Sequence, residues 1–419
     1  MKFDIIVAGA GASGLAAAYQ AAVLQPQLNI LVLEKEKVPG RKLSAAGNGK
    51  CNLTNMEFTQ ECYHSGNHMF MKQWVLEHSY EEISDFFESL GVLLYQKNGY
   101  YYPVSNQGKQ VTRLLYEKSR RAGVQYGLGT RVTGVEPRHG KRGMYYEVTG
   151  IQENGSTVTY HARYVILALG GASAPKLGGS SSGYALTKKL NLKCNPLYPA
   201  LSPIYVEDSL LSVTKGVRLD GTVTLYDGKC VLAKETGQIQ FNEKSLSGIV
   251  MMNLSCYLNA PDKRASEACL HIDTLPGFSW NRLKDFMSCQ KQDFQEESVE
   301  FMLDGILPNP FARYISRRLK LDKELILRNM TEKQIDRLVS SLKKLKFTPV
   351  FKEDYEKAQV TGGGIALEEV SCDSFSCKRY ENLYITGELL DAYGKCGGYN
   401  LTFAILSGIQ AVKDIYSRL

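Results

Sequence analysis

The first 24 residues place the strongest constraint on the fold. The segment KFDIIVAGAGASGLAAAYQAAVL has no charged residue from Ile5 to Leu24. A run of about 20 uncharged residues is long enough to cross a membrane, but glycines interrupt this run and Asp4 lies at its edge. The pattern also changes from the β-branched residues 5–7 to the helix-favouring residues 15–22. This change predicts a buried strand followed by a helix, and neither a membrane span nor a signal peptide.

Three glycines between that strand and that helix predict a dinucleotide site. Gly9, Gly11 and Gly14 have the spacing G-x-G-x-x-G. The first allows a tight turn, the second lets a pyrophosphate approach the backbone, and the third lets the helix pack closely on the strand. The helix N-terminus offers free N–H groups to phosphates. A second strand, NILVLE, ends in Glu34, where an acid can bind the ribose of adenosine and disfavours the 2′-phosphate of NADP.

The long loop after Glu34 favours FAD over NAD. It contains Gly40, Arg41 and Lys42, and then a second glycine-rich run at residues 47–52, GNGKCN. FAD is longer than NAD and needs further contacts, and small residues let the backbone lie against a flat ring. A surface loop with incidental charges is the alternative on these residues alone.

The C-terminal segment repeats the order of strand, glycines and helix. Residues 383–386 predict a strand, Glu388 follows, and Gly397 and Gly398 precede a helix from about Tyr399 to Ile415. We expect Glu388 to hydrogen-bond a ribityl hydroxyl and the helix N-terminus to stabilise negative charge on a reduced flavin. An ordinary return from strand to helix is the alternative.

The central segment ARYVILALGGASAPKLGG predicts a third strand that ends in glycines near the cofactor. It lacks the G-x-G-x-x-G spacing, so we expect no second nucleotide-binding domain. NAD(P)H, as a transient electron donor, would then reach the flavin through a shared or open site.

The residues predicted to bind FAD come from all of these segments. They are Gly9, Ala10, Gly11, Ser13, Gly14, Glu34, Lys35, Gly40, Arg41, Lys42, Gly49, Cys51, Asn52, Arg131, Val132, Ala168, Gly170, Gly171, Gly387, Glu388, Gly397, Gly398, Tyr399, Asn400 and Leu401.

Cysteine usage and charge exclude several other classes of function. The ten cysteines include no C-x-x-C and do not cluster with the six histidines, which predicts no metal site. Without an export signal these thiols should be reduced, as in the cytoplasm. Cys372 and Cys377 are spaced like the redox pair of some disulfide reductases, but they lie far along the chain from the expected flavin-facing helix.

The net charge of +7 is scattered along the chain and no nucleic-acid-reading motif is present, so we expect no nucleic-acid partner. The sequence carries no signal for an oligomeric state.

Taken together, the motifs resemble the bacterial BaiN/YhiN-like flavoproteins, which are NAD(P)/FAD-dependent oxidoreductases. The resemblance covers nearly the whole chain, with GAGASGL, GRKLSAAGNGKCNLTN, YPALSPI, VTGGGIALEEV and GELLDAYGKCGGYNLTFA. It implies an α/β fold in three parts: a split Rossmann-like FAD domain at 1–194 and 351–419, an inserted β-barrel-like domain at 195–275, and a small helical domain at 276–350. The chain departs from the family at GNGK, where a glycine triplet and arginine are usual, and at Cys396, where threonine is usual, and these departures bear on the substrate.

Local signals fix some elements inside these domains. Two Asp-Gly pairs, at 220–221 and 227–228, are hairpin-turn signals in the β-rich segment. Thr331 predicts the N-cap of a helix. The segments YEEISDFFESLGV and QVTRLLYEKSRRAGV predict amphipathic helices that stop at glycine.

Three hypotheses of function follow from a flavin, which transfers hydride while the protein positions the substrate. The first is an NAD(P)H-dependent reductase of an activated C=C bond in a small hydrophobic substrate, such as the bile-acid or steroid enones that the resemblance implies. It needs a polarising donor and a proton source, for which Tyr393, Cys396 and Tyr399 are the nearest candidates. The second is an oxidase of a small primary amine such as aminoacetone, with dioxygen as acceptor. The third is a flavin-binding protein that either has a non-catalytic, regulatory role or takes part in RNA modification.

Overall fold

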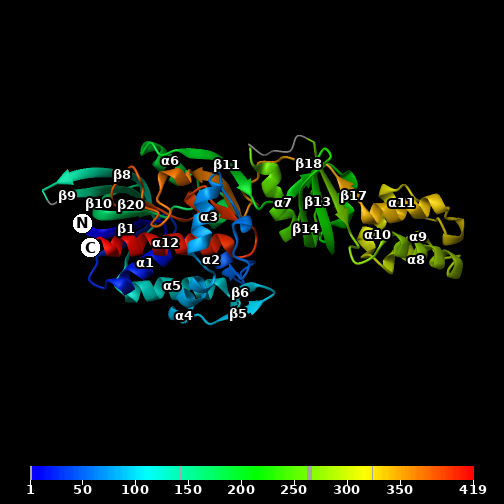
Figure 1. Ribbon diagram of the computed structural model, residues 1–419, viewed down its shortest axis with the longest axis horizontal. Helices are drawn as coiled ribbons and strands as arrows, with labels where there is room; N and C mark the ends of the chain where they lie inside the picture. Colours follow the sequence, from blue (N-terminus) through cyan, green and yellow to red (C-terminus); the bar gives the residue numbers. More distant parts are fainter. Residues whose placement is uncertain (1, 142, 262–266, 323) are drawn as a thin grey trace. The chain divides into compact units, whose positions relative to one another are not determined.

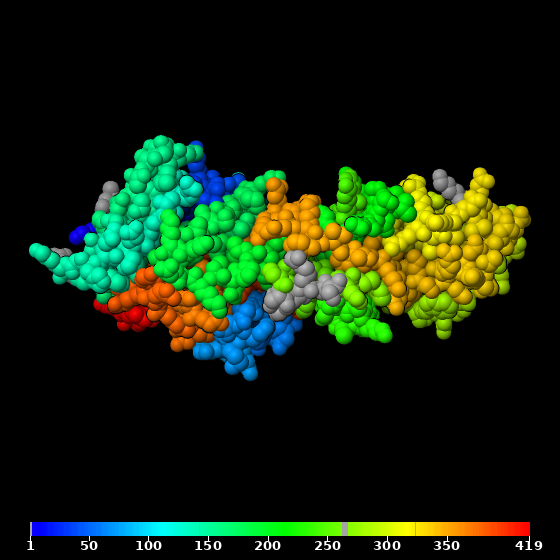
Figure 2. Space-filling view, turned by 90° about the horizontal axis from the view of Figure 1, so that it is seen from above, coloured from blue at the N-terminus to red at the C-terminus, as the bar shows by residue number. Residues whose placement is uncertain are grey.

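The chain folds into two compact units. The computed structural model describes residues 2–141, 143–261, 267–322 and 324–419. Unit 1 comprises Met1–Pro199 and Tyr355–Leu419, and unit 2 comprises Ala200–Asp354. Figure 1 places both termini in unit 1, and Figure 2 shows the blue N-terminal and red C-terminal residues on that same unit. Unit 2 is therefore an insertion, and the two ends of the chain build one body.

A seven-stranded sheet forms the centre of unit 1. Its strand order is β7-β2-β1-β10-β9-β8, and β20 also pairs with β10. The bounds are β1 Lys2–Ala8, β2 Ile30–Glu34, β7 Gln125–Leu128, β8 Thr130–Gly140, β9 Gly143–Gln152, β10 Thr157–Leu167 and β20 Leu383–Ile385. The pairs β7–β2, β2–β1, β1–β10 and β10–β20 are parallel. Ile5, Ile6 and Val7 are fully buried, because parallel strands are covered on both faces.

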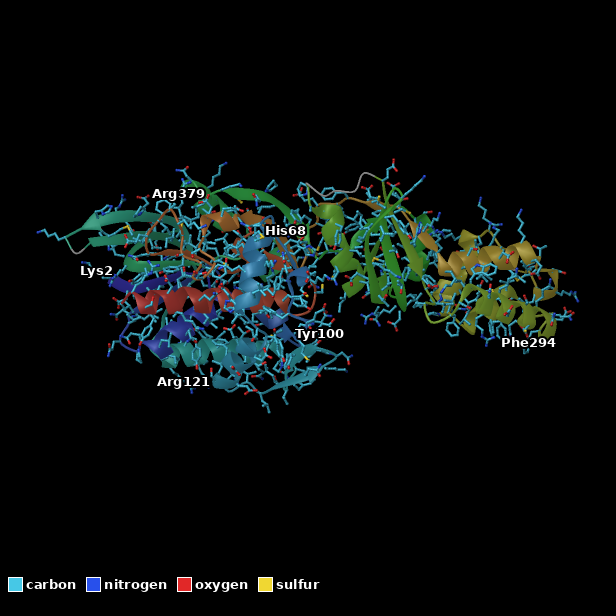
Figure 3. The ribbon with its side chains drawn as sticks, in the orientation of Figure 1. Lys2, His68, Tyr100, Arg121, Phe294 and Arg379 are labelled. Atoms are coloured by element: carbon cyan, nitrogen blue, oxygen red, sulfur yellow. The ribbon has the colours of Figure 1, made fainter. Side chains whose placement is uncertain are left out.

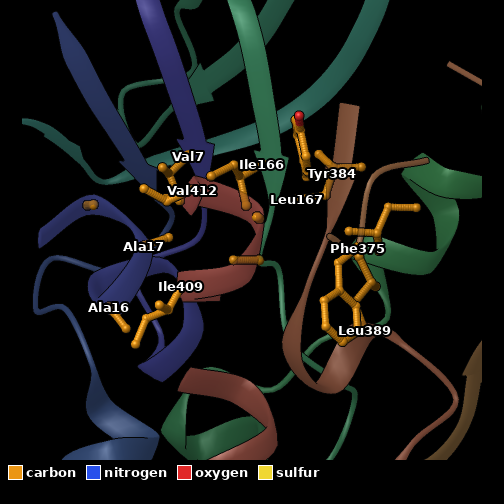
Figure 4. Packing of buried hydrophobic residues seen from close by; sticks show 14 of the residues in the cluster. Val7, Ala16, Ala17, Ile166, Leu167, Phe375, Tyr384, Leu389, Ile409 and Val412 are labelled. Atoms are coloured by element: carbon orange, nitrogen blue, oxygen red, sulfur yellow. The ribbon is translucent and has the colours of Figure 1, made fainter. Parts of the chain in front are cut away.

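Two helices from opposite ends of the chain pack against each other beside this sheet. These are α1 (Ala12–Leu24) and α12 (Tyr399–Ser417). A Cβ at Gly408 would lie 2.6 Å from the Ser13 carbonyl oxygen, so only glycine permits this close approach. Figure 4 shows Ala16 and Ala17 of α1 near Ile409 of α12. Small side chains on both helices thus hold the N-terminal and C-terminal segments together.

Shorter elements complete unit 1. They are α2 Arg41–Ala45, β3 Thr54–Asn55, β4 Tyr63–His64, α3 His68–Glu77, α4 Glu81–Ser89, β5 Leu94–Lys97, β6 Tyr100–Pro103, α5 Gly108–Arg121, α6 Ser182–Lys189, β11 Cys194–Ala200, β19 Val360–Ile365 and β21 Tyr393–Gly394. They form the small sheets β3-β6-β5, β21-β4 and β11-β19. As predicted, α4 and α5 stop before glycines with positive φ, Gly91 and Gly123.

Unit 2 contains a seven-stranded antiparallel sheet and five α-helices within its described residues. The strand order is β17-β16-β13-β14-β15-β12-β18. The bounds are β12 Ile204–Val206, β13 Arg218–Asp227, β14 Cys230–Phe241, β15 Ser245–Ser247, α7 Ile249–Asn259, β16 Ala268–Asp273, α8 Trp280–Asp293, α9 Val299–Asp304, α10 Asn309–Arg318, α11 Glu332–Lys343, β17 Leu345–Phe347 and β18 Pro349–Val350. The sheet and the helices share one hydrophobic core, in which the rings of Phe241 and Phe311 lie 4.9 Å apart.

One of the two Asp-Gly turn predictions is wrong. β13 and β14 are joined at Asp227-Gly228, as predicted, but Gly221 lies inside β13 and pairs with Gly237. A Cβ at Gly221 would lie 2.9 Å from both the Asp273 carbonyl oxygen and the Ile239 side chain. Glycine is present there because strands and core side chains approach closely. Within the part of the chain that is described, no helix has both the length and the apolar character needed to cross a membrane.

Candidate cofactor site

The turn between β1 and α1 leaves open space at only one of its three glycines. A Cβ at Gly9, where φ is +105°, would lie 2.2 Å from the Ala168 carbonyl oxygen, and one at Gly14 would lie 1.9 Å from the Gly9 carbonyl oxygen. A Cβ at Gly11 would have no atom within 4 Å among the described residues. Gly9 therefore allows close approach to the end of β10, and Gly14 allows α1 to pack on the turn, whereas Gly11 borders a free space that a pyrophosphate fits.

The N-terminus of α1 is suited to an anion. Gly11 is its N-cap residue, no side chain caps it, and its first turn holds no acidic residue. The first N–H groups of a helix have no partner within the helix, and the helix dipole favours negative charge there. Ser13, in this first turn, directs its hydroxyl to Thr386 Oγ1 at 2.8 Å, so this predicted cofactor residue links α1 to the segment after β20.

Glu34, at the end of β2, is held beside the same turn. Its Oε2 accepts a hydrogen bond from the Ala10 N–H at 2.7 Å, and its Oε1 accepts one from the Glu36 N–H at 2.9 Å. The Gly129 N–H donates to the Glu36 carbonyl at 3.3 Å, which brings the start of β8 to this corner. Lys35 and the β8 residues Arg131 (exposed) and Val132 (buried) lie along these segments. These predicted FAD residues thus come from neighbouring segments.

Gly40 and Arg41, two of the predicted FAD residues, also contact other parts of the protein beside the turn. Gly40, with φ +65°, donates its N–H to the Ala10 carbonyl at 2.8 Å and so fixes α2 beside the turn. Arg41 pairs with Glu36 at 2.5 Å and donates to the Lys176 carbonyl at 2.6 Å. The Arg41 side chain is therefore engaged with protein groups at the edge of the site.

Lys42 and Glu388 join the two ends of the chain. Lys42 Nζ lies 2.6 Å from Glu388 Oε2, and the Thr361 N–H donates to Glu388 Oε1 at 2.9 Å. A Cβ at Gly171 would lie 2.4 Å from Glu388 Oε1, so a glycine after β10 makes room for this carboxylate. Three segments that are distant in sequence, near residues 42, 171 and 388, therefore meet at one corner. Gly170 has φ +70° and borders open space.

The second glycine-rich run is a tight loop with one unsatisfied polar atom. Gly47, Asn48, Gly49 and Cys51 all have positive φ. Asn52 Oδ1 is buried and has no hydrogen-bond partner among the described residues. A buried acceptor normally has a donor, and the hydroxyls and ring N–H of FAD are donors.

Cys51 in this loop is a packing residue. It is fully buried, its Sγ lies 3.9 Å from the Leu43 carbonyl oxygen, and burial raises the pKa of its thiol to about 12. A thiol with so high a pKa is a poor nucleophile at neutral pH.

The glycine loop before α12 packs against Thr54, which follows the glycine-rich run 47–52. Gly398 is the N-cap residue of α12, with φ +96°, and a Cβ there would lie 2.7 Å from the Thr54 N. Thr402 in α12 donates to Thr54 Oγ1 at 2.9 Å. Asn400 accepts from the Gly394 N–H and donates to the Gly394 carbonyl, both at 2.9 Å, and it thereby fixes the loop before α12. No side chain caps α12, so two uncapped helix N-termini belong to this site. Gly387 (φ +70°) precedes Glu388, and Leu401 is half-buried.

The three candidate catalytic residues have different surroundings. Tyr399 is 4% exposed, its ring lies 5.7 Å from that of Tyr63, and burial raises its pKa well above the ordinary value, which describes a packed ring. Cys396 is half-buried and its Sγ donates to Gln359 Oε1 at 3.7 Å. Tyr393 is buried and its hydroxyl lies 3.1 Å from the Tyr198 hydroxyl.

Sequence reasoning did not identify Tyr198, Thr361 or Tyr100 as site residues. Tyr198 begins the segment YPALSPI, which was noted only as part of the family resemblance. Tyr100, labelled in Figure 3, lies on β6 beside the loop before α12, since a Cβ at Gly397 would lie 3.1 Å from its ring. Only tertiary contacts bring these residues to the site.

The spacing of Cys372 and Cys377 does not correspond to a reactive pair. Both thiols are free, burial raises the pKa of Cys372 to about 12, and burial also raises that of Cys377. The Cys372 thiol donates to the Phe70 carbonyl at 3.6 Å. Disulfide exchange requires a thiolate. Burial raises the pKa of both thiols, so the thiolate forms are disfavoured at neutral pH.

Comparison with known proteins places this geometry in a family. The HI0933-like protein Rossmann domain matches residues 3–414. The chain belongs to this family. It is an α/β, FAD-binding, Rossmann-like flavoprotein and an FAD-dependent oxidoreductase. The open space at Gly11, the orphan acceptor of Asn52 and the uncapped helices α1 and α12 all fit FAD.

Curated relatives match along nearly the whole chain. The protein is 30% identical over 405 residues to a 3-dehydro-bile acid delta(4,6)-reductase of Clostridium scindens, covering 97% of each chain. It is 26% identical over 419 residues to a ribosomal RNA dihydrouridine synthase of Escherichia coli, covering 99% of this chain and 98% of the relative. Because one such relative modifies RNA, the absence of a nucleic-acid partner stays a prediction.

Solved structures show the same fold. The 3-ketosteroid delta1-dehydrogenase of Sterolibacterium denitrificans has a TM-score of 0.52 with 13% identity, over 100% of both chains. The FrdA chain of Escherichia coli quinol fumarate reductase has a TM-score of 0.51 with 15% identity, over 100% of this chain and 70% of that one.

Proposed function

We propose that this protein is an NAD(P)H-dependent, FAD-dependent reductase of a C=C bond conjugated to a carbonyl group in a small hydrophobic substrate. The observation that carries the proposal is the meeting of both chain ends around one cradle, through the Lys42–Glu388 pair at 2.6 Å and the Thr402–Thr54 hydrogen bond at 2.9 Å. The 30% identity to a bile-acid reductase along 97% of both chains supports this choice of reaction.

The chain's own residues supply binding and orientation. When bound, reduced FAD supplies a hydride. The N–H groups at the start of α1 hold the pyrophosphate, and Glu34 accepts from the ribose hydroxyls. The N-terminus of α12 stabilises negative charge at the flavin end. Glu388 accepts from a ribityl hydroxyl while Lys42 and the Thr361 N–H keep its carboxylate in place.

Reduction of uridine in ribosomal RNA is the second candidate, because relatives in Escherichia coli and Haemophilus influenzae are ribosomal RNA dihydrouridine synthases, each 26% identical to this chain. Dihydrouridine forms by reduction of a ring C=C bond conjugated to a carbonyl. The two candidates therefore require the same flavin chemistry and differ in what surrounds the reacting bond.

Anaerobic half-reactions separate these functions. The purified yellow protein is titrated with NADH or NADPH, and flavin absorbance should be lost. A conjugated 3-dehydro-bile acid should then restore it, with a saturated product detected by mass spectrometry. Restoration only by unmodified ribosomal RNA would favour the second candidate. Bleaching by aminoacetone, reversed only by dioxygen, would replace the reductase with an amine oxidase, and a flavin that none of these reagents bleaches would favour a non-catalytic protein.

A further inference from the structure

We propose that Tyr198 and Tyr393 form a proton-donating pair for this reductase, in which Tyr198 gives a proton to the substrate and Tyr393 replaces it. The inference rests on the proposed function. The two hydroxyl oxygens lie 3.1 Å apart and either can donate. Tyr198 is half-buried, whereas Tyr393 is only 2% exposed. The pair therefore has an outer member that a substrate can reach and an inner member behind it.

Both tyrosines adjoin the segments that form the cofactor site. The ring of Tyr198 lies on Gly362, since a Cβ there would be 2.3 Å from the ring. Gly362 directly follows Thr361, whose N–H donates to Glu388. Tyr393 begins the segment that leads through Cys396 to the N-terminus of α12. The hydroxyl pair thus lies between the Glu388 corner and the loop at the start of α12, where we expect the flavin ring.

The surroundings of Tyr393 hold its hydroxyl in a fixed position. Its strand, β21, pairs with β4, and its ring stacks on His64 with centroids 5.0 Å apart at 23°. Two residues earlier, Asp391 Oδ2 accepts from Asn195 Nδ2 at 2.7 Å and from the Gly66 N–H at 3.1 Å. A general acid must be positioned to within hydrogen-bonding distance of its target, and these contacts supply such rigidity.

The proton balance of the step is complete. The β carbon of the conjugated substrate receives the hydride supplied by reduced FAD, and the C=C π pair moves to the α carbon. The α carbon takes the proton from Tyr198 Oη, which breaks the O–H bond of Tyr198. Tyr198 recovers a proton from Tyr393 Oη, and water that reaches the more exposed Tyr198 side after product release returns a proton to the pair. NAD(P)H replaces the hydride, so one turnover consumes one NAD(P)H and one proton.

Half-reactions of Tyr→Phe variants test the pair. Tyr198→Phe should bleach with NAD(P)H at the wild-type rate, whereas its reoxidation by the conjugated 3-dehydro-bile acid should slow by about 100-fold or more, because general acids contribute roughly 10²–10⁴-fold. Tyr393→Phe should slow the same half-reaction by about tenfold. The solvent deuterium isotope effect on the wild-type reoxidation should disappear in Tyr198→Phe. The Tyr95→Phe control loses a hydroxyl that donates to Asn106 at 2.8 Å and should match the wild type.

Binding and folding are measured separately from turnover. FAD content, thermal midpoint and the flavin difference spectrum on adding the bile acid to oxidised enzyme should be unchanged in Tyr198→Phe. Reoxidation of Tyr198→Phe within threefold of the wild-type rate, with its isotope effect intact, would overturn the pair. If the bile acid does not reoxidise the wild-type reduced enzyme at all, that result contradicts the proposed function, and the proton-donating pair is then rejected together with it.

Discussion

The three glycines of the N-terminal turn show how residues that look alike in the sequence differ in space. Each is part of the same G-x-G-x-x-G spacing. A side chain at Gly9 or Gly14 would overlap backbone oxygens at 2.2 and 1.9 Å, whereas one at Gly11 would enter open space. Gly11 also has an ordinary backbone conformation, with φ −78°. We therefore expect cofactor binding and folding to depend on different glycines of one motif.

This difference gives a prediction for matched variants. Gly11→Val should fold with a thermal midpoint close to that of the wild-type apoprotein but should retain little or no FAD, because its side chain occupies the pyrophosphate space. Gly14→Val should fail to fold, since its Cβ would displace the backbone of Gly9. Flavin-to-protein absorbance ratios and circular dichroism melting measure both effects. A fully yellow Gly11→Val protein would contradict the assignment.

Cys51 provides a pH-dependent test at the same scale. Burial raises the pKa of its thiol to about 12, so at pH 8 only about one molecule in 10⁴ carries the thiolate. Iodoacetamide at pH 8 should therefore modify the exposed Cys230 and Cys289 and leave Cys51 unmodified in the folded protein. Peptide mass spectrometry reads the pattern, and urea should expose Cys51. Rapid labelling of Cys51 without urea would show that the loop opens.

Elements were predictable where a local signal fixes their ends. Thr331 accepts from the Gln334 N–H, and the Gln334 side chain accepts from the Thr331 N–H, so α11 begins with the predicted N-cap in the form of a capping box. The helices α4 and α5 stop before Gly91 and Gly123. The Asp-Gly signal was ambiguous, because Gly221 serves close strand approach instead of a turn.

The capping box predicts a measurable loss of stability. Thr331→Ala should lower the free energy of unfolding of unit 2 by about 1 kcal/mol, and Thr331→Ser should restore most of it. The chain has two tryptophans, Trp74 in unit 1 and Trp280 at the start of α8. In a Trp74→Phe background, the fluorescence of Trp280 therefore reports on unit 2 during urea unfolding. Equal midpoints for the alanine variant and its parent would rule out the cap as a stabilising feature.

At the scale of the whole molecule, unit 1 depends on contacts between the two ends of the chain. Lys42 and Glu388 are 346 positions apart, and their side chains are 32% and 18% exposed. Ser13 and Thr386 form a second such contact at 2.8 Å. The insertion of unit 2 between these ends leaves the cradle to be completed only when the C-terminal segment folds onto the N-terminal one.

A double-mutant cycle on Lys42 and Glu388 measures this coupling. Lys42→Met and Glu388→Gln should each destabilise unit 1, and the double variant should recover about 1–2 kcal/mol relative to the sum of the single variants. Urea unfolding followed by Trp74 in a Trp280→Phe background gives the free energies. Both single variants should also release FAD more readily in gel filtration. Additive free energies would mean that the pair contributes nothing measurable, as for many exposed ion pairs.

The amino-acid sequence by itself determined the class of fold and the cofactor. Hydrophobic runs, glycine spacing and the acid at Glu34 are local features, and each has a direct physical consequence for a strand, a turn or a helix end. The same local reasoning led to the predicted FAD residues, but it did not indicate that the Arg41 side chain bonds the Glu36 carboxylate and the Lys176 carbonyl.

Only the tertiary structure decided which distant residues share a corner. Lys42 meets Glu388, Tyr198 meets Tyr393, and Tyr100 meets the loop at Gly397. No local sequence pattern predicts these contacts. They form only when the N-terminal and C-terminal parts of unit 1 pack together to the density of a protein core. The residues that we propose to move protons depend on that packing.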